Sequence, residues 1–101
     1  MDAMINPHLK ELILIDMGLT WDQIDILMPT LVYIEQLHLV RNNCKHICSQ
    51  FTIKKDYFKN LKFINLEQNG IESWDEVTGF RVLQNLKRLT MTKNLLKEIK
   101  Y

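Results

Sequence analysis

The amino-acid sequence predicts an α/β solenoid of about four coils, with a parallel sheet on its concave side and helical segments on its convex side. Two features of the sequence support this fold. A pattern of apolar residues ending near an asparagine occurs four times, with copies starting near residues 9, 34, 61 and 86. Between copies, apolar residues recur at spacings of three and four, which is the period of an amphipathic helix.

The repeated pattern is Leu-x-x-Leu-x-Leu-x-x-Asn-x-Leu, which is typical of a leucine-rich repeat. The stretch LKFINLEQNGI, residues 61–71, fits it at every position. Successive copies start 25, 27 and 25 residues apart, and such repeats have periods of about 20 to 29 residues. The other copies are Leu9, Leu12, Leu14, Met17 and Leu19; Ile34, Leu37, Leu39, Asn42 and Cys44; and Leu86, Leu89, Met91, Asn94 and Leu96.

Each copy is expected to form a short strand around its second and third apolar positions, and successive strands are expected to pair in parallel. Alternate side chains of a strand point to the same face of a sheet. We therefore expect two layers of inward-pointing side chains, one made of Leu12, Leu37, Ile64 and Leu89 and the next of Leu14, Leu39, Leu66 and Met91.

The asparagine of the pattern follows the strand, where the chain bends and leaves backbone N–H and C=O groups without sheet partners. A buried asparagine both donates and accepts hydrogen bonds, so Asn42, Asn69 and Asn94 are expected to form a ladder along the bends. Met17 occupies this position in the first copy and cannot make such bonds. We therefore expect the first bend to be held in a different way.

The segments that follow the first and third bends have helical features. Each contains an apolar stripe at helical spacing, which also assigns both tryptophans to the core. Residues 45–60 lack this periodicity, so we expect them to be irregular, with Lys54-Lys55-Asp56 as a solvated bulge. The two stripes are Trp21, Ile24, Leu27 or Met28, and Leu31; and Trp74, Val77, Phe80 and Leu83.

The starts of these two segments carry helix-capping residues. Thr20 and Ser73 are suited to be N-caps, and each is followed by Trp-Asp. Gln23 and Glu76 stand three residues after the hydroxyl, which is the spacing of a capping box. A helix is therefore expected to begin at Trp21, and the same start is indicated after Ser73.

The chain of 101 residues is long enough for one domain and too short for two, so we expect a single repeat domain over residues 1–101. The chain stops at Tyr101 inside the fourth coil, so the domain is expected to be a fragment of a longer chain. A net charge of +1 gives no electrostatic reason to expect nucleic acid or a membrane as partner. We expect no secretory signal, because residues 1–7 have neither a basic nor an apolar region of that kind, and no membrane span, because no apolar run approaches the roughly 18 residues that cross a bilayer.

Two thiols and an imidazole lie close together in Cys44-Lys45-His46-Ile47-Cys48. Zinc sites draw their ligands from two separated pairs, and no second pair is present, so a structural role for Cys44 at its apolar pattern position is favoured. We expect no enzyme, cofactor or metal, the alternative being a thiol or metal hydrolase built on these residues. Two cysteines are too few for a disulfide framework, which favours a reducing, cytoplasmic setting.

Side chains that alternate with the inward leucines are expected to line the concave face. Several are apolar where solvent is expected, and the charges run from acidic in the first coil to basic in the fourth, a combination that favours a protein interface. The alternative is that scattered exposed apolar residues are normal, or that flanking sequence covers them. The candidate partner-binding residues are Glu11, Ile13, Ile15, Asp16, His38, Val40, Arg41, Phe63, Asn65, Glu67, Arg88 and Lys93.

The segments LKELILIDMGLTWDQI, IEQLHLVRNNC, LKFINLEQNGIESWDEV and LKRLTMTKNLL together resemble the leucine-rich repeat domain of the tubulin-folding cofactor E family. The resemblance covers about residues 7–98, and its distinguishing mark is Thr-Trp-Asp or Ser-Trp-Asp at the start of a return segment. It implies a cytosolic chaperone module that binds α-tubulin in assembly or dissociation of the αβ heterodimer. The alternative is a general intracellular repeat scaffold of the phosphatase-regulator or dynein-light-chain type.

Overall fold

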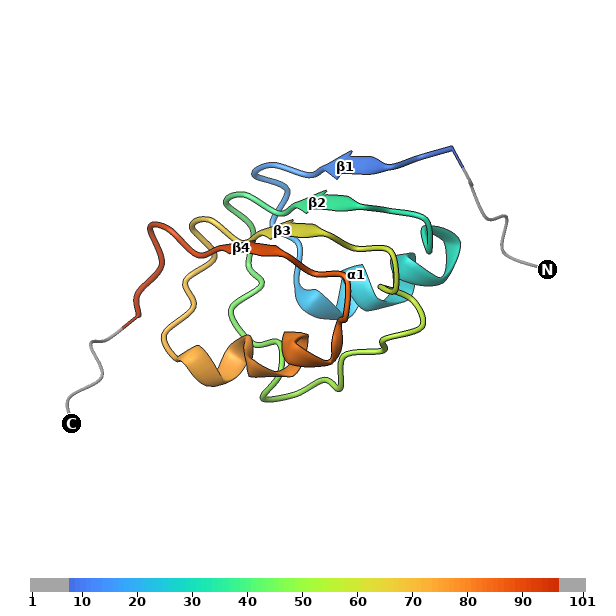
Figure 1. The fold of residues 1–101 in the computed structure, drawn as a ribbon. Coiled ribbons are helices and arrows are strands. Elements are labelled where there is room, and N and C mark those ends of the chain that lie inside the picture. Colours follow the sequence, from blue (N-terminus) through green and yellow to red (C-terminus); the bar gives the residue numbers. More distant parts are fainter. Residues whose placement is uncertain (1–7, 97–101) are drawn as a thin grey trace.

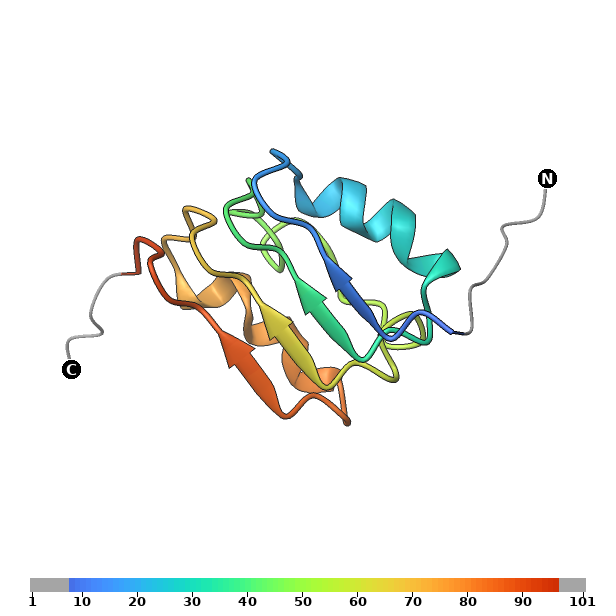
Figure 2. The same cartoon turned by 90° about the horizontal axis from the view of Figure 1, so that it is seen from above.

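The computed structural model describes residues 8–96, in which a four-stranded parallel sheet is backed on one side by helical segments (Figure 1). The strands are neighbours in chain order, so the predicted α/β class and parallel pairing are confirmed. Figure 2 shows the same order from above. The strands are β1 (Glu11–Ile13), β2 (Gln36–His38), β3 (Phe63–Asn65) and β4 (Arg88–Thr90).

The pairing register of the strands confirms the first predicted core layer. Leu12 pairs with Leu37, Leu37 with Ile64, and Ile64 with Leu89. Leu37 and Ile64 are fully buried on the two central strands, whereas Leu12 and Leu89 on the edge strands are partly buried. The second layer shows the same gradation, with its central members fully buried and its outer members partly buried: Leu14, Leu39, Leu66 and Met91.

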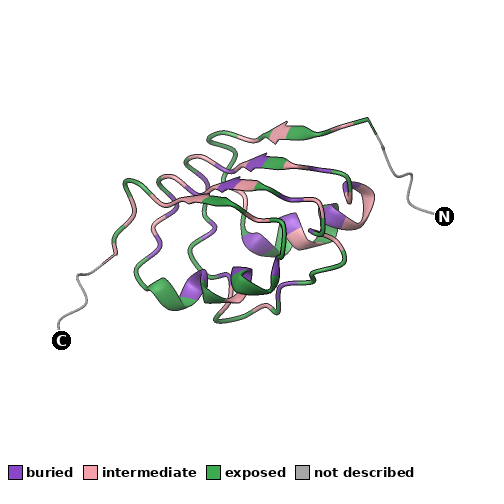
Figure 3. Ribbon diagram, viewed as in Figure 1, coloured by how far each residue is buried: buried purple, intermediate pink, exposed green. Residues whose placement is uncertain are grey.

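The helical segments lie on the same side of the sheet and carry much of the core (Figures 1 and 3). Helix α1 begins as predicted, and the backbone N–H of Thr20 donates to Gln23 Oε1 at 2.9 Å, as in a capping box. No helix of residues 8–96 is long and apolar enough to cross a membrane. The elements are α1 (Trp21–Leu27) and the 3-10 helices η1 (Met28–Thr30), η2 (Trp74–Glu76) and η3 (Thr78–Val82).

Trp21 connects three of the segments that back the sheet. Its ring stacks on Phe58, with 5.8 Å between the ring centroids, and meets Phe80 edge-on at 5.6 Å. The predicted core position of Trp21 is therefore confirmed, and the three rings join α1, the irregular second segment and η3.

The predicted core position of Trp74 is wrong, because 45% of this side chain is exposed. The third return segment consists of two short 3-10 helices instead of one regular helix, and they are interrupted at Val77 (φ −119°, ψ −2°). A 3-10 helix has about 3.0 residues per turn instead of 3.6, so Trp74 in η2 does not lie on the face of the three later residues of the stripe. Val77, Phe80 and Leu83 are buried, and in η2 it is Glu76 that turns inward.

Glu76 holds the irregular segment 45–60, which contains no helix or strand, as its missing periodicity predicted. The predicted capping role of Glu76 is wrong, because its carboxylate is buried and accepts hydrogen bonds from residues of the irregular segment. Oε1 accepts the backbone N–H groups of Ile47 and Ser49 at 2.7 and 3.1 Å and the Ser49 hydroxyl at 2.9 Å, and Oε2 lies 3.4 Å from His46 Nδ1. The Glu76 carboxylate thus fixes the start of the irregular segment to η2.

The asparagine ladder along the bends is confirmed, and each asparagine reaches back into the preceding unit. Asn42 Oδ1 accepts the backbone N–H groups of Met17 and Leu19 at 3.0 and 3.1 Å, and its Nδ2 donates to Leu14 O at 2.8 Å. The expectation that the first bend is held differently is therefore wrong, because Asn42 serves it. Each asparagine bonds the unit before its own. Met17 belongs to the first unit of residues 8–96, and no described unit precedes it, so no asparagine is needed there.

Candidate protein-binding face

The face of the sheet that points away from the helices presents three rows of side chains, which we call the open face. The first two rows are given by the strand register. The third row lies just beyond the strands, where the backbones are still paired, because Asp16 N donates to Val40 O at 2.9 Å. All twelve candidate residues lie on this face or in the adjoining bends. The rows are Glu11, Gln36, Phe63 and Arg88; Ile13, His38, Asn65 and Thr90; and Ile15, Val40, Glu67 and Thr92.

Four predicted residues from the four strands form one chain of contacts across the open face. His38 Nε2 lies 3.0 Å from Glu11 Oε2, and the imidazole meets the ring of Phe63 edge-on at 5.2 Å between centroids. The guanidinium of Arg88 lies over the same Phe63 ring, 4.7 Å from its centroid. A hydrogen bond, aromatic packing and a cation–π contact therefore fix side chains that the sequence placed on the face only individually.

The exposed apolar residues gather at the β1 side of the open face. Ile13 and Ile15 are 54% and 44% exposed, and Val40, in the same row as Ile15, is half-buried. Phe63 is also half-buried, but it contacts His38 and Arg88 and lies in the first row. The apolar strip therefore consists of Ile13, Ile15 and Val40, and polar His38 separates it from Phe63.

The predicted residues Asp16, Arg41 and Lys93 lie in the bends beyond the strands, not on the strands themselves. Together with Gln68 they have φ values of 54° to 58°, in the left-handed region, immediately before the asparagine position of each unit. This conformation costs a non-glycine residue roughly 1–2 kcal/mol. After Arg41, Gln68 and Lys93 the next residue is an asparagine of the ladder, whose hydrogen bonds offset that cost, whereas Asp16 is followed by Met17.

The charges of the open face separate between its two sides, as the sequence predicted. Glu11 and Asp16 are in the first unit, and Arg88 and Lys93 are in the fourth, with Arg41 between them. Glu67 interrupts the basic side, but it accepts a hydrogen bond from the Thr92 hydroxyl at 3.0 Å. A partner that covers the whole face would meet apolar and acidic groups at one end and cations at the other.

The cysteine–histidine cluster is divided among different surroundings. Cys44 is fully buried, and burial raises the pKa of its thiol to about 12. Burial also raises the pKa of half-buried Cys48, and exposed His46 contacts Glu76. Within residues 8–96, no group of three or more His, Cys, Asp or Glu side chains is arranged to hold a metal ion. Cys44 is a core residue, as its pattern position predicted.

A match to a curated relative supports the family resemblance. The chain is 38% identical over 96 residues to tubulin-folding cofactor E of Arabidopsis thaliana, and it is related to that protein. The match covers 92% of this chain and 18% of the relative, so the chain spans less than a fifth of the relative's length. No protein-family model and no solved structure matches the chain.

Proposed function

We propose that this chain is a leucine-rich repeat module of a tubulin-folding cofactor and that its open face binds α-tubulin. The observation that carries this proposal is the 38% identity to tubulin-folding cofactor E over 96 residues. In this role the module works in the cytoplasm, beside microtubules, and contributes to assembly or dissociation of the αβ heterodimer. It acts by binding, with no catalysis or cofactor of its own.

The repeat assignment is supported by three independent properties of residues 8–96. The pattern copies recur at 25, 27 and 25 residues, the strands stack in parallel and in chain order, and the asparagines connect each bend to the one before it. Each property is typical of a leucine-rich repeat solenoid, in which a unit contacts only its sequence neighbours.

The open face is the surface best suited to bind a protein. Ile13 and Ile15 place apolar side chains in solvent, and the acidic residues Glu11 and Asp16 flank them along the same unit. Apolar residues with a charged rim are typical of protein interfaces. The contacts among Glu11, His38, Phe63 and Arg88 hold side chains of this face in place before binding, which reduces the entropy lost on association.

Retention of purified αβ-tubulin on the immobilised chain tests this proposal. The double variant Ile13→Asp, Ile15→Asp is expected to fold normally, because both side chains are exposed, and to weaken retention at least about tenfold. The matched control is Ile26→Asp, which changes a 72% exposed isoleucine of α1 on the other side of the sheet. The control is expected to stay within about twofold of the unchanged chain.

Two results would contradict the proposal in different ways. If the folded chain retains no tubulin, the tubulin assignment is wrong and a general scaffold of the phosphatase-regulator or dynein-light-chain type takes its place. If Ile26→Asp weakens retention as much as the double variant does, tubulin binds but the open face is not its site.

A further inference from the structure

We propose that a groove beside β3 and β4 binds an acidic segment of a partner protein. The groove is at the ends of these strands that lie farthest from the bends. The groove lies between the end of the irregular second segment and the turn that leads from η3 into β4. None of the residues that line it belongs to the open face, and the proposal does not rest on the binding of tubulin.

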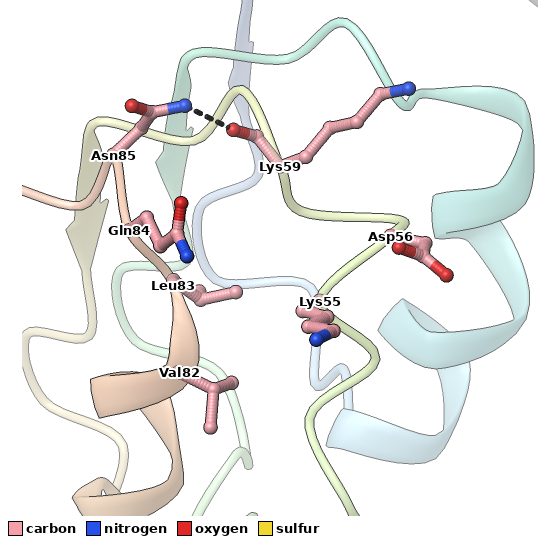
Figure 4. Close-up of a pocket in the computed structure, with 7 residues that line it drawn as sticks. All are labelled: Lys55, Asp56, Lys59, Val82, Leu83, Gln84 and Asn85. Carbon is pink, nitrogen blue, oxygen red and sulfur yellow. Dashed lines mark hydrogen bonds between the residues drawn. The ribbon is translucent and has the colours of Figure 1, made fainter.

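The groove has two walls that come from different units (Figure 4). Residues 82–85 form one wall, and Lys55, Asp56 and Lys59 form the other, around a cavity of about 340 Å³. A hydrogen bond from Asn85 Nδ2 to Lys59 O at 2.6 Å closes one end. A second hollow of about 490 Å³ adjoins the first and shares Lys55, Asp56 and Val82 with it. Together the two hollows can hold several residues of an extended peptide.

The segments around the groove carry an excess of positive charge. Residues 53–63 and 81–88 contain seven of the chain's 13 lysines and arginines and only one of its 12 acidic residues, Asp56. Their backbones are adjacent, because Lys87 N donates to Lys62 O at 2.9 Å. The net charge of the whole chain is only +1, so the positive charge around the groove comes from the clustering of cations there and not from a generally basic composition. The cations are Lys54, Lys55, Lys59, Lys62, Arg81, Lys87 and Arg88.

Two of these seven cations are already in ion pairs, and Arg88 lies over the Phe63 ring. Lys54 Nζ pairs with Asp25 at 2.7 Å, and Lys62 Nζ pairs with Glu35 at 3.1 Å. Lys55 and Lys59 in the groove wall and Lys87 beside it form no ion pair within residues 8–96. A carboxylate entering the groove therefore gains attraction without breaking an existing pair.

The lining of the groove favours a peptide over a nucleic acid. Val82 is 50% exposed and offers an apolar contact, and Gln84 and Asn85 offer amide groups that can bond to a peptide backbone. Binding of single-stranded nucleic acid relies on free aromatic rings for base stacking. Tyr57 is the aromatic residue of the adjoining hollow, and Lys54 Nζ already lies 5.8 Å from its ring centroid. An acidic segment with one apolar side chain fits these groups.

Fluorescence anisotropy of the 101-residue chain with a labelled peptide tests the proposal. The probe is a ten-residue peptide of glutamates with one central leucine, compared with an oligothymidylate of equal length and with phosphatidylserine vesicles. The peptide is expected to bind more tightly than either, with an affinity that falls as salt rises. Lys55→Glu and Lys59→Glu are each expected to weaken peptide binding about tenfold, because each replaces an attraction by a repulsion.

The matched control is Lys45→Glu, which changes the net charge equally at an exposed lysine near Gly70. It is expected to alter peptide affinity by less than about twofold, as is Ile13→Asp, Ile15→Asp on the open face. No peptide binding, equal losses in the control and the groove variants, or tighter binding of the oligothymidylate or the vesicles would overturn the proposal. Failure of tubulin binding would leave it intact.

Discussion

Asn69 Oδ1 accepts the backbone N–H of Cys44 at 3.0 Å, across 25 positions of the sequence. The same side chain donates through Nδ2 to Leu39 O at 2.7 Å and to Glu67 O at 3.1 Å. One buried amide therefore bonds backbone groups on two successive units, and Glu67 O also accepts the backbone N–H of Arg41 at 2.9 Å. Burial of these groups without partners is costly, so the amide both stabilises the bend and aligns the units.

Replacement of this amide is expected to destabilise the fold. Asn69→Ala leaves Cys44 N–H and Leu39 C=O without their partner, and we expect the free energy of unfolding to fall by about 1–3 kcal/mol. Urea denaturation measures the change. The control is Asn43→Ala, an exposed asparagine next to a ladder residue, which is expected to stay within about 0.5 kcal/mol. An unchanged midpoint for Asn69→Ala would contradict the ladder.

Glu76 is expected to make stability depend on pH on the acid side. Burial opposes ionisation of its carboxyl, but hydrogen bonds from Ile47, Ser49 and His46 outweigh burial, so its pKa is lowered from the ordinary value. A group with a lowered pKa in the folded state stabilises the fold above its unfolded pKa, and this contribution is lost as pH falls through the folded pKa. The loss should therefore begin near pH 4.3, the ordinary glutamate value, and continue below it.

The variant Glu76→Gln separates this contribution from the general effect of acid. At pH 7 we expect it to be less stable than the unchanged chain by about 1–3 kcal/mol, because a neutral amide oxygen is a weaker acceptor than a carboxylate for the three hydrogen bonds that Oε1 accepts. The difference should shrink as pH falls below about 4. Denaturation midpoints measured from pH 7 to pH 3 check this, and a constant difference would exclude Glu76 as the titrating group.

Gly79 is expected to be required by the packing of η3 against the irregular segment. A Cβ atom at this position would lie 2.8 Å from Cys48 Sγ and 3.2 Å from Ile53 Cγ1. Gly79→Ala should therefore lower the free energy of unfolding by about 1–3 kcal/mol. The double variant Gly79→Ala, Cys48→Ala removes the closer contact, and its cost should be smaller than the sum of the two single costs. Simple additivity would show that Cys48 does not limit the space.

The two thiols are expected to react at very different rates in the folded chain. Cys44 is buried with a pKa of about 12, so its thiolate fraction is about a thousandfold below that of an ordinary thiol at neutral pH. Cys48 is half-buried, and iodoacetamide at pH 8 should therefore modify it first. Mass spectrometry of the modified chain identifies the site, and both thiols should react in denaturant. Equal rates in the folded chain would contradict the burial of Cys44.

The sequence alone was sufficient for the order of the strands, their register and the residues of the asparagine ladder, but it missed that Asn42 holds the bend of the preceding unit. When a pattern recurs every 25 to 27 residues, each unit repeats the position of the one before it, shifted by one strand spacing. Equivalent residues such as Leu37, Ile64 and Leu89 are therefore neighbours in the sheet. Alternation along each strand then determines which side chains, such as Ile13, leave the core. These inferences need only one period and one local rule.

Only the tertiary structure decided the contacts between segments that do not repeat. The exposure of Trp74, the inward turn of Glu76 and the groove beside Lys59 depend on how return segments of different length pack together. The link from Glu11 through His38 and Phe63 to Arg88 likewise joins side chains brought together across strands. Periodicity determines the position of a backbone unit, but side-chain packing between dissimilar segments is determined by shape and hydrogen bonding in three dimensions.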